Sequence, residues 1–164
     1  MLYYNTGCNV NQYIEYGATM NLTTALKRAQ QYCDDHQQRF TEQRRQVLAI
    51  LLSNETPIGA YEIMKVLSDK KTSVNPPTVY RAIDFWVKHG FIHKIESMNA
   101  YKACCQHHDH QYALMMICQG CQSVQEIALD KLPTQLKKIL AAYEFNPNKS
   151  TLEISGQCKK CKND

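Results

Sequence analysis

Four cysteines in two close pairs are the residues of this 164-residue sequence whose types and spacing most directly indicate chemistry. Cys118 and Cys121 form one C-x-x-C pair, and Cys158 and Cys161 form another. One such turn supplies two adjacent corners of a tetrahedron, so a closed shell needs a second rigid turn. Four thiolates form the closed tetrahedral shell typical of structural zinc. We therefore predict structural zinc here rather than disulfides or a thioredoxin-like redox pair, which needs only one C-x-x-C motif.

A second group of candidate ligands lies between the two halves of the sequence. It contains His93, Cys104, Cys105, the run HHDH at 107–110, and Glu126. A mixed set of thiolate, imidazole and carboxylate ligands suits zinc. Each histidine alone is more typical of a hairpin surface or a solvated loop. Their concentration at a junction predicts a second, sensory metal site, because a metal there can fix the relative orientation of two domains.

The rest of the sequence sets the context for these thiols. We expect a cytoplasmic protein without a membrane contact, because residues 1–20 lack a secretory signal and the longest apolar runs, 47–52 and 112–118, are far below the roughly 20 residues of a membrane helix. Cytosolic thiols stay reduced, which favours metal binding over disulfides. No role is predicted for the remaining thiols, Cys8, Cys33 and Cys105.

The first half of the sequence predicts a winged helix-turn-helix. Apolar residues recur at helical spacing from Thr24, and further helices are expected after Thr41, around 60–67, and from Pro76-Pro77 to about His89. The strings FIHKI and YKAC flank the turn SMNA, as in a two-stranded hairpin. Residues 20–95 hold 11 Lys/Arg against 7 Asp/Glu, a modest indication of a polyanionic partner.

The second half predicts two strands, each of which runs into a C-x-x-C motif. The first covers 112–117 and the second is TLEIS, and a helix capped by Asp130 is expected between them. Pairing of these two strands could bring both cysteine pairs to one end of a sheet.

Several strings of the sequence resemble those of a known family. The strings RFTEQRRQVL (39–48), AYEIM (60–64) and PPTVYRAIDFWVKHGFIHKIES (76–97), together with CQGC and CKKC, are similar to the ferric uptake regulator family and its zinc uptake regulator branch. The resemblance implies an α+β fold, with an N-terminal winged helix-turn-helix domain followed by a small α/β zinc-containing dimerisation domain. The expected division is an N-terminal extension (1–20), a winged-helix domain including its wing (21–104), and a dimerisation and metal-binding domain (105–164).

The resemblance also implies roles for individual residues. The expected ligands of a regulatory zinc are His93, Cys104, His110 and Glu126, with His108 as the alternative to His110. The expected DNA-contacting residues are Tyr61, Thr78, Tyr80 and Arg81. Arg81 also falls on the outward face of its predicted helix, and an arginine can bind guanine or phosphate with two hydrogen bonds.

The function implied is a zinc-responsive repressor of zinc-uptake genes, which binds a palindromic DNA operator as a homodimer carrying two zinc ions per chain. An iron- or peroxide-responsive regulator of the same family remains an alternative. A purely structural zinc module for protein binding is another, but it leaves PPTVYRAIDF unexplained. We do not expect an enzyme or a small-molecule substrate, because the H-x-E and P-C-x-x-C strings of zinc deaminases are absent.

Overall fold

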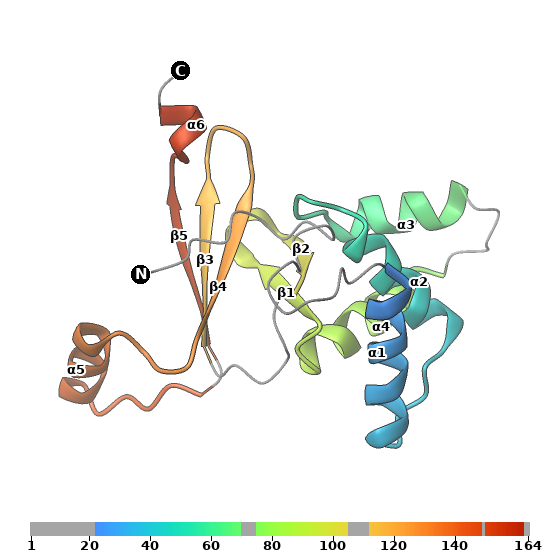
Figure 1. Cartoon of the computed structure of the whole chain (residues 1–164), viewed down its shortest axis with the longest axis horizontal. Helices are drawn as coiled ribbons and strands as arrows, with labels where there is room; N and C mark the ends of the chain where they lie inside the picture. Colours follow the sequence, from blue (N-terminus) through green and yellow to red (C-terminus); the bar gives the residue numbers. More distant parts are fainter. Residues whose placement is uncertain (1–21, 70–74, 105–111, 149, 163–164) are drawn as a thin grey trace.

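The computed structural model describes residues 22–69, 75–104, 112–148 and 150–162, which form two units side by side (Figure 1). The first unit contains α1 (Leu22–Asp35), α2 (Glu42–Leu52), α3 (Ala60–Asp69), α4 (Pro76–Lys88), and the strands β1 (Ile92–Ile95) and β2 (Ala100–Ala103) joined by a 3-10 turn, η1 (Glu96–Met98). The second contains β3 (Tyr112–Cys118), β4 (Val124–Leu129), α5 (Thr134–Ala142), β5 (Ser150–Gly156) and α6 (Lys159–Lys162). This order confirms the predicted α+β fold. The predicted extension, residues 1–20, lies outside the described residues.

The helices of the first unit begin and end where local chemistry directs them. The Thr41 hydroxyl accepts a hydrogen bond from the Arg44 amide at 3.3 Å, which caps α2 as predicted. The Gly59 amide donates to the Glu62 carboxylate at the start of α3. α4 opens on the proline pair, and Gly90 follows its end with a φ of 76°, a conformation that favours glycine.

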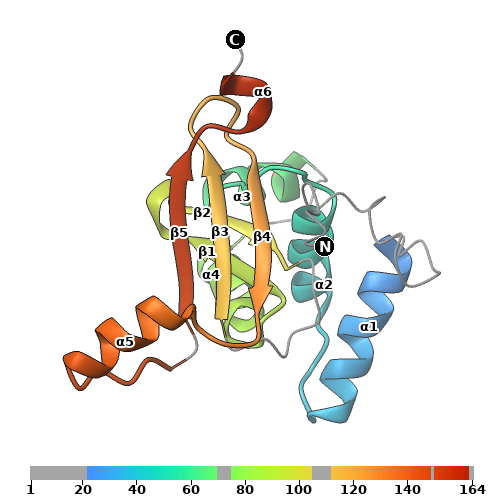
Figure 2. The same cartoon turned by 60° about the vertical axis from the view of Figure 1, so that its left-hand side comes forward.

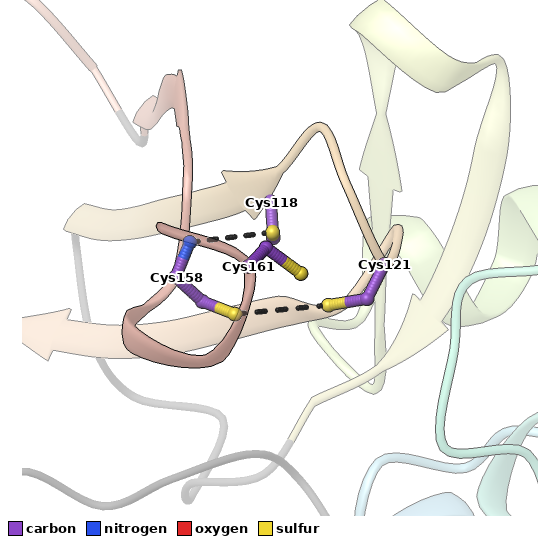
Figure 3. A group of neighbouring side chains, drawn as sticks. All are labelled: Cys118, Cys121, Cys158 and Cys161. Carbon is purple, nitrogen blue, oxygen red and sulfur yellow. Dashed lines mark hydrogen bonds between the residues drawn. The ribbon is translucent and has the colours of Figure 1, made fainter. Parts of the chain in front are cut away.

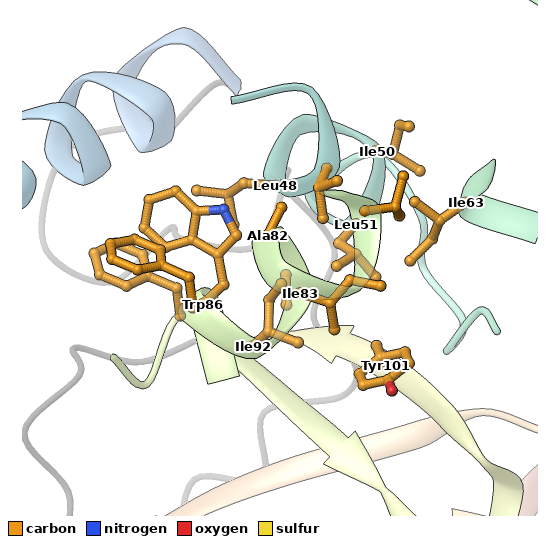
Figure 4. Packing of buried hydrophobic residues seen from close by; sticks show 14 of the residues in the cluster. Leu48, Ile50, Leu51, Ile63, Ala82, Ile83, Trp86, Ile92 and Tyr101 are labelled. Carbon is orange, nitrogen blue, oxygen red and sulfur yellow. The ribbon is translucent and has the colours of Figure 1, made fainter. Parts of the chain in front are cut away.

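Helices α1 to α4 enclose the main hydrophobic core (Figure 4). Trp86 and Leu48 lie in it with at most 1% of their surface exposed. The indole of Trp86 donates a hydrogen bond to the Arg44 carbonyl at 2.9 Å, so its one polar atom is satisfied inside the core. The core thereby fixes α4 against α2.

The hairpin of β1, η1 and β2, which we call the wing hairpin, lies between the helices and the three-stranded sheet (Figure 1). Side chains alternate between the faces of a strand. Ile92 belongs to the helical core, whereas Ile95 packs with Met115 and Val124 of the sheet in a second core cluster. One face of the wing hairpin is thus buried against each unit.

The sheet has the strand order β4-β3-β5, with β3 antiparallel to β4 and parallel to β5. Cys118 at the end of β3 pairs with Gly156 at the end of β5. The predicted pairing of these strands is therefore confirmed, and both C-x-x-C turns leave the same end of the sheet.

The region between the two C-x-x-C strands differs from the sequence prediction. A strand, β4, was not expected there, and α5 begins at Thr134 after Pro133 instead of being capped by Asp130. A residue before proline is driven toward extended backbone, so the chain stays non-helical up to Pro133. Among the described residues, none of the helices is long and apolar enough to span a membrane.

Candidate metal centres

The four cysteines of the two C-x-x-C motifs meet at one end of the sheet (Figure 3). Their sulfur atoms all lie within 4.8 Å of one another. The Cys158 amide donates a hydrogen bond to Sγ of Cys118 at 3.3 Å, and the sulfur atoms of Cys121 and Cys158 are 3.9 Å apart. Four soft ligand atoms in so small a volume suit a tetrahedral zinc ion.

The electrostatics of the four thiols favour partial ionisation by the protein alone. Hydrogen bonds from the backbone at Cys121 and Cys158 lower the pKa of Cys118 to about 6. Hydrogen bonds with Cys158 and Cys118 raise the pKa of Cys161 to about 12. Close thiolates repel one another, so ionising all four requires a cation among them. The group is thus suited to bind a divalent metal, and one thiolate is already favoured near neutral pH.

The backbone of the two turns is closely fitted around the sulfur atoms. A Cβ atom on Gly120 would lie 2.9 Å from both Cβ and Sγ of Cys161. The Gln119 amide donates to the Gly156 carbonyl at 2.8 Å and so ties the first turn to the end of β5. The two turns therefore hold each other in place through the backbone as well as through the thiols.

A second group of ligand atoms lies where the wing hairpin contacts the sheet. Nε2 of His93 lies 2.9 Å from Oε1 of Glu126, and the Cys104 thiol donates to the same oxygen at 3.3 Å. The three ligand atoms lie within 4.8 Å of one another, and all three residues are buried. His93 and Cys104 come from one unit and Glu126 from the other. A metal ion held by this set would join the two units.

The histidine run that was expected to complete this group, with His110 or His108 as the fourth ligand, falls in residues 105–111, outside the described residues. Cys105 lies there too. The three described ligands leave zinc's usual fourth position to a further residue or to water.

A sequence profile of the ferric uptake regulator family matches residues 35–155 of this chain. The chain belongs to the ferric uptake regulator family. The zinc uptake regulation protein of Escherichia coli (strain K12) is 31% identical to this chain over 137 residues, which cover 83% of this chain and 80% of the relative. That identity and coverage place the resemblance across most of both chains.

Solved structures extend the likeness from sequence to fold. The structure of a zinc uptake regulator complexed with zinc and DNA matches this chain with a TM-score of 0.78 at 31% identity. The match covers 87% of this chain and 96% of the chain in that structure. The crystal structure of holo XcZur matches with a TM-score of 0.74 at 33% identity, covering 85% and 97%. The predicted membership of the ferric uptake regulator family is therefore confirmed.

The residues that this family membership suggests for DNA contact lie on α3 and α4. Tyr61 on α3 is 76% exposed, and Tyr80 on α4 is 45% exposed. Arg81 is also exposed, while Thr78 is half-buried near the start of α4. Helix α4 buries its opposite face, including Trp86, in the main core. Aromatic and cationic side chains are thus available on a rigidly held helix.

Two polar residues at the junction of the units were missed by sequence reasoning. Lys102 on β2 pairs in register with His93, is only 2% exposed, and donates from Nζ to the Glu55 carbonyl at 2.7 Å. Glu153 on β5 accepts hydrogen bonds from the backbone of η1. The signal was weak, because a polar residue on an alternating strand normally indicates the solvent face.

Proposed function

We propose that this protein is a zinc-responsive transcriptional repressor of zinc-uptake genes, which binds a palindromic operator as a zinc-loaded homodimer. The observation that carries the proposal is the convergence of His93 of the wing hairpin and Cys104, the residue directly after it, with Glu126 of the sheet. A ligand that binds across two units favours the arrangement in which its contacts are complete. We propose the division into a winged-helix domain (21–104) and a metal-binding dimerisation domain (105–164) on the same grounds.

The donor atoms support zinc at both centres. A closed set of four sulfurs, Cys118, Cys121, Cys158 and Cys161, fits a structural zinc ion. The second centre combines thiol, imidazole and carboxylate, and the soft sulfur of Cys104 favours zinc over harder metals. We propose His110 as its fourth ligand. Bound zinc would supply a positive charge that neutralises Cys104 and Glu126 and links the two domains.

Unburied apolar surface on the second domain supports a homodimer. Helix α5 has no buried residue and stands away from the sheet (Figure 2). Ile139 and Tyr143 are 56% and 82% exposed, and Ile154 on the edge strand β5 is 58% exposed. Exposed apolar patches of this kind mark interaction surfaces. A second copy of the chain would cover this surface with a matching one.

The exposed residues of α4 support DNA binding by this dimer. We propose that Tyr80, Arg81 and Thr78 of α4, with Tyr61 of α3, contact the operator. The recognition helix of a helix-turn-helix, the position that α4 occupies in the proposed winged-helix domain, enters the major groove of DNA. A twofold dimer then reads two half-sites in opposite directions. The operator is therefore expected to be approximately palindromic. Fixing each wing hairpin against its sheet sets the distance between the two copies of α4.

The size of the expected effect follows from linkage. Coupling between two binding sites is typically about 1 to 3 kcal/mol, so zinc at the junction would change operator affinity by about 5- to 150-fold. The effect is reciprocal, and operator DNA should tighten zinc binding by the same factor.

Zinc per chain, measured by elemental analysis together with operator titration, tests the proposal. We expect two zinc ions in the native protein and about one in Cys104→Ala, with the dimer retained and operator affinity lowered by about 5- to 150-fold. Cys33→Ala is the matched control, because its thiol is buried in the helical core and belongs to neither ligand group, and it should keep both ions. A Cys104→Ala variant that keeps two ions and full affinity would refute the assignment. Iron bound at the junction would instead favour an iron-responsive regulator. Zinc binding without sequence-selective DNA binding would favour a protein-interaction module.

A further inference from the structure

Glu153 joins the sheet to the wing hairpin without any metal ligand. Its Oε1 accepts a hydrogen bond from the Glu96 amide at 2.7 Å, and its Oε2 accepts one from the Ser97 amide at 3.1 Å. Both amides belong to η1, at the tip of the wing hairpin, whereas Glu153 lies on β5, 57 residues from Glu96. The carboxylate thus uses both oxygens to hold a turn of the other domain.

These contacts resemble the capping of a helix N-terminus by a carboxylate. Amides at the start of a helical turn lack partners within it, and a negative charge there is stabilised by the aligned peptide dipoles. Burial raises the pKa of Glu153, but hydrogen bonds from the Ser97 side chain and from the Ser97 and Glu96 amides outweigh it, so the net pKa lies below its ordinary value. The carboxylate is therefore ionised at neutral pH, and hydrogen bonds to an ionised acceptor are the stronger kind.

The strand register places Glu153 in one row with the regulatory ligand Glu126. Met115 on the central strand pairs with Glu126 on one side and with Glu153 on the other. Met115 is fully buried and packs with Ile95 of the wing hairpin. The row therefore contacts the wing hairpin at three points, namely the ligand group, an apolar centre and η1. Only the first of these involves metal ligands.

We infer that Glu153 is a positioning residue, which latches the wing hairpin to the sheet before any metal binds and thereby brings His93 and Cys104 close to Glu126. The inference deepens the proposed function and rests on it for its consequence at the regulatory site. If the hairpin is held in place only part of the time, the apparent zinc affinity falls in proportion to the competent fraction. Glu153 raises that fraction and so strengthens zinc binding at the junction.

The latch is tested first in protein that retains its structural zinc and has been stripped of regulatory zinc. Hydrogen exchange at the Glu96 and Ser97 amides is compared in the native protein, Glu153→Ala and Glu153→Gln. We expect protection to fall about tenfold or more in Glu153→Ala, because both acceptors are lost. Glu153→Gln keeps one acceptor oxygen and should lie between the two.

The second measurement is zinc titration of the regulatory site. We expect Glu153→Ala to weaken zinc binding there by about 5- to 30-fold, with Glu153→Gln again intermediate, while structural zinc and the dimer are retained. Glu96→Gln is the matched control. It removes a carboxylate from the same turn, one that forms an exposed ion pair with Lys94, but leaves the Glu96 amide in place.

The outcomes separate the latch from the proposed function. Unchanged amide exchange in Glu153→Ala would overturn the latch, even if zinc represses as proposed. Weaker zinc binding in Glu96→Gln equal to that in Glu153→Ala would also overturn it, because the effect would then be one of charge alone. A native protein that takes no second zinc ion while Glu153→Ala loses amide protection would sink the proposed function and leave the latch standing.

Discussion

A methyl group added at Gly120 would meet Cys161 at 2.9 Å, on both its Cβ and its Sγ. We expect Gly120→Ala to weaken structural zinc binding and to destabilise the second domain, because overpacking a rigid site costs about 1 to 3 kcal/mol. Zinc retention against increasing chelator concentration and the thermal unfolding midpoint measure both effects. Gly156→Ala is the control, since nothing lies within 4 Å of a Cβ there. Zinc retention and an unfolding midpoint in Gly120→Ala equal to those of Gly156→Ala and the native protein would show that the turn tolerates the extra atom.

Lys102 is a buried lysine whose partner in the strand register is His93, one of the proposed regulatory ligands. Burial lowers its pKa, while Glu126 and Glu55 act to raise it. A positive charge near Glu126 stabilises the metal-free carboxylate and repels an incoming cation. We therefore expect Lys102→Met to tighten regulatory zinc binding, by about 3- to 10-fold on electrostatic grounds.

Competitive titration with a zinc-sensitive dye measures this change. Lys94→Met removes an exposed lysine from the neighbouring strand and should leave zinc affinity nearly unchanged. Weaker binding in Lys102→Met would mean that its hydrogen bond to the Glu55 carbonyl matters more for ordering the wing hairpin than its charge matters for the metal.

At the scale of elements, the predictable features were those with local causes. Thr41 as a cap, the proline pair that opens α4 and Gly90 beyond its end each act within a few residues, and the structure has all of them. The C-x-x-C spacing is equally local. What joins the two cysteine pairs is the parallel pairing of β3 with β5, which the two similar strand patterns suggested.

Strand β4 was missed because one of its inward positions holds a carboxylate instead of an apolar residue. Val124 and Glu126 both face the interior, so a carboxylate interrupts the alternation that marks a half-buried strand. That carboxylate is tolerated because it contacts His93 and Cys104. Glu153 and Lys102 are likewise polar residues on strands, and their hydrogen-bond partners are distant in sequence. In the sequence, polar residues that join the two proposed domains therefore look the same as surface residues, because their partners come close to them only in the folded chain.

The exposed face of α4 carries a prediction for DNA. Arg81→Ala should weaken operator binding by about 1 to 3 kcal/mol and reduce discrimination against a scrambled duplex, because an arginine that reads a base contributes both. Fluorescence anisotropy with the two duplexes gives the measurement. Lys88→Ala removes an equal charge near the end of the same helix. If the two variants lose affinity alike and keep the same discrimination, Arg81 contributes only general electrostatic attraction.

The apolar face of β5 carries a prediction for assembly. Ile154→Glu should shift the dimer toward monomer, because a charge would replace apolar surface in the proposed interface. Light scattering coupled to size-exclusion chromatography reports the mass. Thr151→Glu is the control, since it adds the same charge to an exposed position on the opposite face of the same strand. A dimeric Ile154→Glu would place the interface elsewhere.

At the scale of the whole molecule, we propose that the two candidate metal centres have different structural tasks. The four-cysteine group is formed within the proposed second domain, and the core cluster there contains five buried residues in the part of the chain that the structure describes, one of which, Ile95, comes from the wing hairpin. Structural zinc sites contribute directly to folding free energy, and a small core depends on them. The regulatory group contains fewer described ligands and draws them from both domains. Its loss should therefore change domain orientation without unfolding either domain.

Stepwise chelation is expected to separate these tasks. A weak chelator should remove one zinc ion per chain, widen the small-angle X-ray scattering distance distribution and lower operator affinity, while circular dichroism and the dimer mass stay constant. A strong chelator should then remove the second ion and unfold the sheet, because metal binding by the four cysteines contributes folding free energy that is lost when their thiols take up protons again. Cys104→Ala should match the first chelated state from the outset. Loss of both ions in a single step, with unfolding and loss of DNA binding together, would mean that one metal-dependent fold, and not a hinged pair of domains, controls the operator.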